Sequence, residues 1–375
     1  MHTRFPPGVG KLRTILALGL ALWAVSAAGQ ASADDQQACD CGCGNSNTVS
    51  SLFWCGVEPL PRDPWYVTAD GMAMQRLFRG LGPIAVMGLS PTASLALSQK
   101  SLDEPFQAGG RLLVGHTFDE SPYQIEVSYY TMTTWDTAAQ AADPMGNLFS
   151  PFTNFGATPG NSSFTNFGAT PDTRVDFNTL VQIRETSRLE DGEVNLKHRL
   201  PLPVGNPMVT LLFGVRHVAV REEFEYMSGP SQNTNPVTVH AHTNNNLWGP
   251  QIGGVVEYGH QDVWLRFEGK AAICENDANR DLFASVNGID ATHPRAFYDG
   301  TATVADISVT LLWHPTTAIT TRFGYQALWV DQLALAARNF VSDVGTLTDA
   351  ASQPALNTRG TLVYHGPFAG LQLSW

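Results

Sequence analysis

The chain has 375 residues, of which only 15% are charged, and its formal net charge at pH 7 is −12. Soluble domains carry about 25% charged residues, so this composition favours a protein whose exterior is apolar, as it is in a membrane. An acidic surface repels a polyanion, which excludes nucleic acid as a natural partner.

The first 33 residues predict a cleavable signal peptide. Arg4, Lys11 and Arg13 surround the start of the apolar run "TILALGLALWAVSAA", and "ASA" at 31–33 supplies small residues for cleavage. Without this leader, 19 basic residues remain against 34 acidic ones, a formal charge of −15. No later stretch approaches the ~18 unbroken apolar residues of a membrane helix, so helical membrane spans are excluded.

Four cysteines lie in the segment 34–64, which we expect to be an N-terminal extension in the periplasm. Disulfides are the default in an exported protein, so pairing within the segment or to another chain is favoured over a metal site. The spacing in "CDCGC" differs from that of structural zinc sites, and no histidine lies close by. The disulfide candidates are Cys39, Cys41, Cys43 and Cys55, whereas Cys274 stands alone.

Residues 65–375 alternate between apolar and polar side chains in many short segments, which predicts β-strands. The clearest is "PYQIEVSYY", where Ile125 and Val127 share one face and Glu126 lies on the other. Ten candidate strands lie near 65–76, 110–118, 122–132, 192–200, 208–218, 248–259, 262–273, 303–313, 318–330 and 361–375.

The connections between these strands alternate between long and short, which is typical of a transmembrane β-barrel with periplasmic turns and extracellular loops. Compact soluble domains rarely contain structureless loops beyond about 12–15 residues. We therefore predict a closed antiparallel barrel of ten strands, or of twelve if the long connections contain a further hairpin. The expected long loops cover 81–109, 133–191, 228–247, 274–302 and 331–360.

The end of the chain, "GPFAGLQLSW", keeps a period of two up to its last residue. A sheet in hydrocarbon can leave no edge unpaired, so we expect this strand to pair with the first one. Its outward residues predict a C-terminal signal that the barrel insertion machinery recognises, namely Leu371, Leu373 and Trp375.

Charged residues fall on the face opposite the apolar one, and we expect them to line the lumen. Because ten strands lie near the narrow end of the barrel range, two interpretations stay open: a paired ionic core that makes the wall rigid, or a narrow polar pore. If the barrel conducts, neutralising Arg266 and Lys270 would shift selectivity towards cations. The predicted lumen-lining residues are Glu126, Glu193, Lys197, Arg199, Arg216, Glu257, Arg266, Glu268, Lys270 and Arg322.

Three positions fit this pattern poorly. His198 falls on the lipid face of its strand, which is tolerable only near the rim. Pro367 interrupts the last strand, where its missing donor predicts a bulge or a strand start. The apolar set changes parity after Val215, so we expect 209–217 to span the membrane, followed by a bulge and an extension beyond the membrane.

Several stretches resemble the planctomycete β-barrel porin family of type seven. They are "GEVNLKHRL", "MVTLLFGVRHVAVREEF", "NNLWGPQIGGVVEYGHQDVWLRFEGKAAI", "TTAITTRFGYQALWVDQL" and "FAGLQLSW". The likeness covers roughly 65–375, without the variable long loops, and its specificity lies in the order and spacing of the blocks together. The resemblance implies a barrel in the bacterial outer membrane and brings no catalytic residue.

Other local patterns favour ordinary structure over a site. The repeat "FTNFGATP" at 152–159 and 164–171 predicts an exposed loop. An acidic loop around Glu275, Asp277, Asp281 and Asp290 could hold calcium, but a solvated loop is favoured. No motif of a lipase or a zinc protease occurs, so no enzyme, cofactor or metal is predicted.

The first functional hypothesis is a narrow porin for small polar solutes or ions in the outer membrane. The second is a filled structural barrel whose loops bind partners. A soluble β-sandwich or propeller remains as the alternative fold, and it would bury Ile125, Leu265 and Val309 in a dry interior.

Overall fold

In the computed structural model, the regular elements among the described residues are β-strands and two short 3-10 turns. The predicted signal peptide, the cysteines before Trp65, and residues 154–171 of the repeat lie outside the described residues. These cover 65–78, 82–88, 93–102, 104–119, 121–153, 177–201, 207–229, 237–286, 289–290, 294–340 and 354–375.

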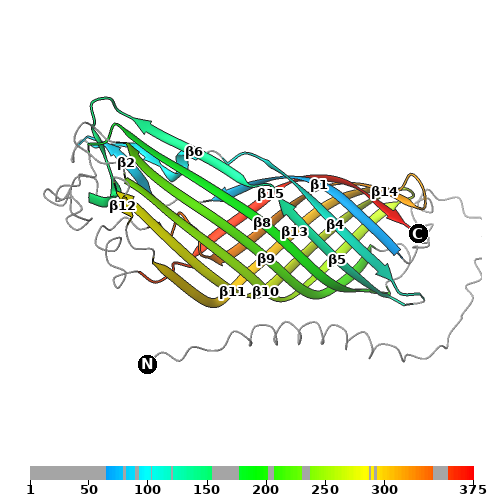
Figure 1. Ribbon diagram of the computed structural model, residues 1–375. Helices are drawn as coiled ribbons and strands as arrows, with labels where there is room; N and C mark the ends of the chain where they lie inside the picture. Colours follow the sequence, from blue (N-terminus) through cyan, green and yellow to red (C-terminus); the bar gives the residue numbers. More distant parts are fainter. Residues whose placement is uncertain are drawn as a thin grey trace, which may run out of the picture. The chain divides into compact units, whose positions relative to one another are not determined.

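Ten antiparallel strands pair in a closed ring (Figure 1). The ring closes because β10 pairs with β11 and β1 pairs with β15. All ten predicted strands are therefore confirmed, as is the predicted fold class. In ring order the strands are β1 (Trp65–Phe78), β4 (Gln107–Thr117), β5 (Tyr123–Met132), β8 (Leu180–Arg199), β9 (Met208–Gly229), β10 (Val237–His260), β11 (Val263–Val286), β13 (Arg295–Trp313), β14 (Ile319–Leu333) and β15 (Gly360–Ser374).

The remaining elements add no strand to the described ring. β6 (Trp135–Ala142) follows β5 and also pairs with β8, and β12 (Ile289–Asp290) pairs with the end of β11. A separate small sheet consists of β2 (Pro83–Met87), β3 (Ser94–Ser98) and β7 (Leu148–Phe149). The two 3-10 turns are η2 (Gln99–Ser101) and η3 (Pro151–Thr153).

The last strand closes the ring against the first one, as the C-terminal pattern predicts. Trp65 and Trp375 exchange two backbone hydrogen bonds, of 3.2 and 3.0 Å. The expectation of a bulge or a strand start at Pro367 is wrong, because β15 begins at Gly360 and runs through the proline. The β1–β15 register is the same on both sides of Pro367, and the ladder loses only the pairs at Ala73 and Met74. The missing donor thus costs local pairing and not register.

Five ring strands are much longer than a membrane requires. β10 and β11 have 24 residues each, β9 has 22, β8 has 20 and β13 has 19, whereas about 9–11 span a bilayer. The prediction of long structureless loops over 228–247 and 274–302 is therefore wrong, since most of these residues continue the barrel wall. The bulge expected after 217 is also wrong, because β9 keeps an unbroken register with both neighbours, whereas the expected extension of the strand beyond 217 is present.

The apolar residues of β9 change parity because the surroundings of the strand change along its length. Phe213 is exposed on the outer face, and Phe224 is fully buried on the inner face of the same strand. Each long strand thus has a part with an apolar exterior, the membrane segment, and a part with an apolar interior, the extension. The membrane segment comprises 191–199, 208–217, 248–260, 263–273 and 304–313, and the extension comprises 180–190, 218–229, 237–247, 274–286 and 295–303.

The exterior of the membrane segment is an apolar band. Along β10, Trp248, Ile252, Val256 and Tyr258 point outwards and are 39–66% exposed. Ten residues at about 3.3 Å each, tilted by about 40°, rise about 25 Å, which is the height of a transmembrane barrel's apolar band. Leu265 and Val309 are exposed as well, contrary to what a β-sandwich would require. No helix among the described residues is long and apolar enough to cross a bilayer.

Candidate functional site: the barrel interior

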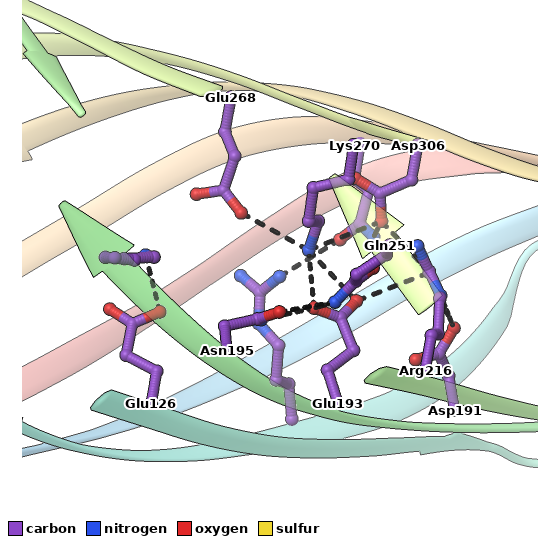
Figure 2. Close-up of polar contacts among 12 residues, drawn as sticks. Glu126, Asp191, Glu193, Asn195, Arg216, Gln251, Glu268, Lys270 and Asp306 are labelled. Carbon is purple, nitrogen blue, oxygen red and sulfur yellow. Dashed lines mark hydrogen bonds and ion pairs between the residues drawn. The ribbon is translucent and has the colours of Figure 1, made fainter. Parts of the chain in front are cut away.

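Charged side chains fill the interior of the membrane segment in a network that we call the ionic layer (Figure 2). The Lys270 ammonium group lies 3.0 Å from a Glu193 carboxylate oxygen and 3.2 Å from Glu268. Glu193 lies on β8 and Lys270 on β11, which are separated in the ring by β9 and β10. The ion pair therefore crosses the interior and shows that both side chains point inwards.

Arg216 is the most deeply buried cation of this layer, with no exposed surface. Its guanidinium nitrogen Nη2 lies 2.6 Å from Asp191, 3.2 Å from Asp306 and 3.5 Å from Glu193. Burying a charge is costly unless partners surround it, and three carboxylates from β8 and β13 meet this requirement. The side chains at this level leave almost no surface open to solvent.

The part of the ionic layer nearer the short turns retains some contact with solvent. The Arg266 guanidinium group forms an ion pair with Glu257 at 2.9 Å, and the Arg266 side chain remains 16% exposed. Tyr66 donates to Glu126, which also pairs with Lys197. The charged residues here thus form pairs, and Arg266 alone of these four keeps a notable exposed part.

All ten residues predicted to line the lumen lie on inward-facing positions of their strands. Nine are buried or nearly so, and Arg199 is half-buried near the rim, where it contacts the Met208 sulfur. With four residues that the sequence pattern did not single out, the layer contains seven basic and seven acidic side chains. The basic ones are Arg111, Lys197, Arg199, Arg216, Arg266, Lys270 and Arg322, and the acidic ones are Asp70, Glu126, Asp191, Glu193, Glu257, Glu268 and Asp306.

The four additional charges lie at positions that a stricter parity count would identify. Asp306 shares the inward parity of Thr310 on β13, and Asp70 shares that of Thr68 on β1. Asp191 was missed because the predicted strand began one residue later. The pairing of Arg111 with Asp70 follows from the neighbouring register of β1 and β4.

Above the ionic layer, one contiguous apolar cluster, the middle core, crosses the whole interior. Nine of the ten ring strands contribute buried side chains to it, among the residues that the structure describes. Leu189, Val220, Leu247 and Leu328 have no exposed surface. A water-filled channel could not pass this level without separating these side chains.

The middle core includes residues that fold inwards after β14. In this inner segment, 334–340, Ala334 and Leu335 are fully buried. Asn245 holds the segment through both backbone groups of one residue, since its amide donates to the Ala334 carbonyl at 2.9 Å and accepts from the Ala334 N–H at 2.7 Å. Asn276 donates to Asn245 and to the Gln332 carbonyl, each at 3.2 Å.

The end of the extension contains a second apolar cluster, the upper core. Val181, Ile183, Phe224 and Tyr226 line the wall there. The separate small sheet and η3 supply the side chains that fill it, including Ile84, Leu97, Leu148 and Phe152. The small sheet therefore works as a cap over the extension.

Between the two apolar cores lies a polar group, the Arg76 cluster. Arg76 pairs with Glu104, Glu185 and Glu222 at 2.6–2.7 Å. Burial and the neighbouring carboxylates raise the pKa of Glu104 to about 7, although Arg76 opposes this shift. Burial and Glu222 likewise raise the pKa of Glu185. Glu222 also accepts the Ala336 N–H at 3.1 Å, which ties the cluster to the inner segment.

The other residues noted in the sequence analysis lie on the outer surface or away from the charged interior. Leu371, Leu373 and Trp375 are 52–60% exposed on the outer face of β15. His198 faces outwards near the short turns and lies against Tyr123, with ring centroids 4.7 Å apart. Cys274 is buried and free.

The loop expected around Glu275, Asp277 and Asp281 is wrong, because these residues lie within β11. Asp281 pairs there with Arg295 across to β13. Among the described residues, no group of three or more His, Cys, Asp or Glu side chains is arranged to hold a metal ion. The calcium alternative thus gains no support.

The closed ring, the apolar outer band and the charged interior define an outer-membrane β-barrel. A family model described as "Putative beta barrel porin-7" matches residues 79–375. The chain belongs to this family, which agrees with the resemblance noted in the sequence. No curated protein matches the chain.

Three solved structures illustrate the barrels that this chain is similar to. The outer membrane protease OmpT from Escherichia coli is 11% identical, with 85% of this chain and 99% of that chain covered and a TM-score of 0.44. A Pseudomonas aeruginosa FadL homologue is 8% identical over 84% and 90%, with a TM-score of 0.23. The transport unit of the Escherichia coli autotransporter AIDA-I is 7% identical over 87% and 94%, with a TM-score of 0.25. Likenesses this distant carry no argument about activity.

Proposed function

We propose that this protein is a filled outer-membrane barrel that serves as a structural and surface-interaction protein. The observation that carries the proposal is the middle core, in which buried side chains from nine ring strands meet in one apolar cluster across the interior. Protein interiors packed in this way contain few voids larger than a water molecule. A solute would have to break this packing in order to pass.

The ionic layer also supports a filled barrel. Its seven basic and seven acidic side chains balance, and those around Arg216 are 0–4% exposed. Desolvated ion pairs are strongly destabilised when one partner is lost. A permeating ion would have to displace such a partner, which makes the layer a structural support for the wall.

Planar-bilayer conductance of the full chain tests the proposal. We expect no discrete conductance steps from a barrel that shows heat-modifiable mobility in detergent gels, a sign that it is folded. Regular steps from the folded wild-type barrel would contradict the proposal. Because misfolded protein is also silent, only preparations with the folded gel band are informative.

A narrow, gated pore is the second candidate, and the attachment of the inner segment favours it. Side chains of the wall, the amides of Asn245 and Asn276 and the carboxylate of Glu222, hold this segment in place, so its release needs no break in the ring. The double substitution Asn245→Ala and Asn276→Ala should then produce flickering conductance. Asn244→Ala is the matched control, because Asn244 points outwards from the same strand. Silence of both variants would contradict gating at this segment.

If the released variant conducts, its selectivity tests the ionic layer as a pore lining. Arg266→Gln and Lys270→Gln leave more negative than positive charge in a balanced interior. Reversal potentials should then move towards those of a cation-selective pore. An unchanged reversal potential would remove the tuning role of these two residues.

The remaining expectations complete the proposal. A signal peptide directs export, and the insertion machinery recognises the C-terminal strand through Leu371, Leu373 and Trp375. Deleting Trp375 should lower the folded yield in the outer membrane, whereas an unchanged yield would argue against recognition. The contacts of the barrel are with outer-membrane lipid and with partners bound at its surface, and no enzymatic step is assigned to it.

A further inference from the structure

Two arginines stand directly opposite each other on the outer wall. Arg188 of β8 and Arg221 of β9 are cross-strand partners, and their side chains are 52% and 48% exposed. Like charges directly opposite in a sheet are destabilising. Such a pair therefore needs negative charge nearby.

Among the described residues, only one carboxylate forms an ion pair with the two guanidinium groups. Glu190 lies 3.1 Å from Arg188 and 3.4 Å from Arg221, using the same oxygen for both. The other acidic side chains of this wall contact different partners. Glu223 and Glu225 lie 3.5 and 3.6 Å from the two ring nitrogens of His240. The pair with its shared carboxylate keeps one net positive charge.

The position of the pair relative to the membrane identifies what can supply the missing charge. His198 and Leu211 are partners in the same ladder near the short turns, ten pairs below Arg188 and Arg221. Ten residues of tilted strand rise about 25 Å, the height of the apolar band. The membrane segment ends at residue 191 on β8 and at residue 217 on β9, so the arginines stand just beyond the band, on the side where the headgroups of the outer leaflet lie.

The neighbouring strand marks the end of the apolar band below the arginines. Trp248 pairs with His217, and their rings stack with centroids 4.2 Å apart. Aromatic residues gather at the interfaces of membrane barrels. Arg221 lies two outward positions beyond His217 on β9, just on the headgroup side of this aromatic pair.

We propose that Arg188 and Arg221 bind the phosphate of an outer-leaflet lipid headgroup. Two guanidinium groups on adjacent strands can donate several charge-assisted hydrogen bonds to the oxygens of one phosphate. The site lies on the exterior and is independent of whether the lumen conducts. It adds a specific lipid contact to the otherwise apolar attachment of the barrel.

The test measures how the purified barrel in neutral detergent responds to lipid A with both phosphates and to the dephosphorylated lipid. The midpoint of heat modification should rise with the phosphorylated lipid only. The double variant Arg188→Gln, Arg221→Gln should bind that lipid at least about tenfold more weakly. A response of unchanged size in this variant would overturn the proposal.

Two single substitutions distinguish a site from a general effect of charge. Arg184 lies on the same outward face of β8 but is neutralised by Asp136, so Arg184→Gln should leave lipid binding unchanged. Glu190→Gln frees both guanidinium groups and should tighten binding. Equal losses in the Arg184 variant and the double variant would overturn the proposal, as would weaker binding in the Glu190 variant.

A final experiment distinguishes binding of the lipid from binding of free phosphate. Inorganic phosphate at millimolar concentration should not reproduce the rise in the midpoint, because it lacks the acyl chains that hold a lipid beside the barrel. Inorganic phosphate could instead reproduce the full rise in the midpoint, and the double variant could lose this response to phosphate as well. In that case the two arginines form a site for free phosphate, and the assignment to lipid is wrong.

Discussion

The same strands form two regions with opposite arrangements of polarity. In the membrane segment of β10, Ile252 and Val256 point outwards, and Gln251 and Glu257 point inwards. In the extension of this strand, His240 points outwards, while Val239 and Ala241 are buried inside. The alternation continues without a register shift. The solvent outside the wall therefore decides which face is apolar.

This comparison explains why the interior is divided into layers. Lipid tails outside the membrane segment give no driving force to bury apolar residues inside, so charges can occupy that interior if they pair. Water surrounds the extension, where burying apolar surface is worth about 25 cal/mol per Å². The extension is thus held together like a soluble protein, and the membrane segment by its ladder and its ion pairs.

The largest expected effect comes from breaking the ionic layer. Arg216→Ala leaves Asp191, Glu193 and Asp306 without their common cation, at a cost of about 3–5 kcal/mol in the free energy of unfolding. Arg221→Ala on the exposed outer face of the same strand should cost no more than about 0.5 kcal/mol. Urea unfolding in detergent compares the two variants. Equal losses would mean that the interior charges contribute no more than surface ones.

A lysine scan along β10 should reveal the boundary between the two regions. Ile252→Lys places a charge near the middle of the apolar band, where it should cost about 2–4 kcal/mol. His240→Lys replaces an outward residue of the extension and should change the free energy of unfolding by no more than about 0.5 kcal/mol. The measurement is folding into lipid vesicles at graded urea concentration. A similar cost at both positions would contradict the placement of the membrane.

The sequence alone was sufficient for the barrel and its closure, because the outward apolar residues of a membrane segment alternate with polar ones. The same rule predicted only part of the extension. There the apolar residues move to the inner face, as at Val220 and Phe224, and the run "NNN" in β10 has the composition of a loop. In β9 the change of parity did predict an extension beyond the membrane, but without the expected bulge, and the strand continues to Gly229.

The contacts across the lumen could not be predicted from the sequence. Alternation shows that Glu193 and Lys270 face inwards, but it does not show that they meet across two intervening strands. That meeting depends on the curvature and stagger of the whole ring. The inner segment was hidden for a related reason, since "ALAARNF" contains no strand pattern and is held by Asn245 and Asn276, far away in sequence.

The smallest effect tests how the extension responds to pH. The carboxyl of Glu104 has a native pKa raised to about 7, chiefly by burial, against an ordinary value near 4.5. Between these pH values the native protein binds more protons than the unfolded chain, so the free energy of unfolding falls as the pH rises. The contribution is complete below pH 4.5 and lost above pH 7, and amounts to no more than about 3 kcal/mol. The titrating groups that face Glu104 are Arg76, Glu185, Glu222 and Tyr364.

Glu104→Gln cannot lose a proton, so its heat-modification midpoint should fall less than that of the wild type between pH 5 and 8. Parallel curves would show that Glu104 does not titrate in this range, and a steeper fall in the variant would reverse the sign of the argument.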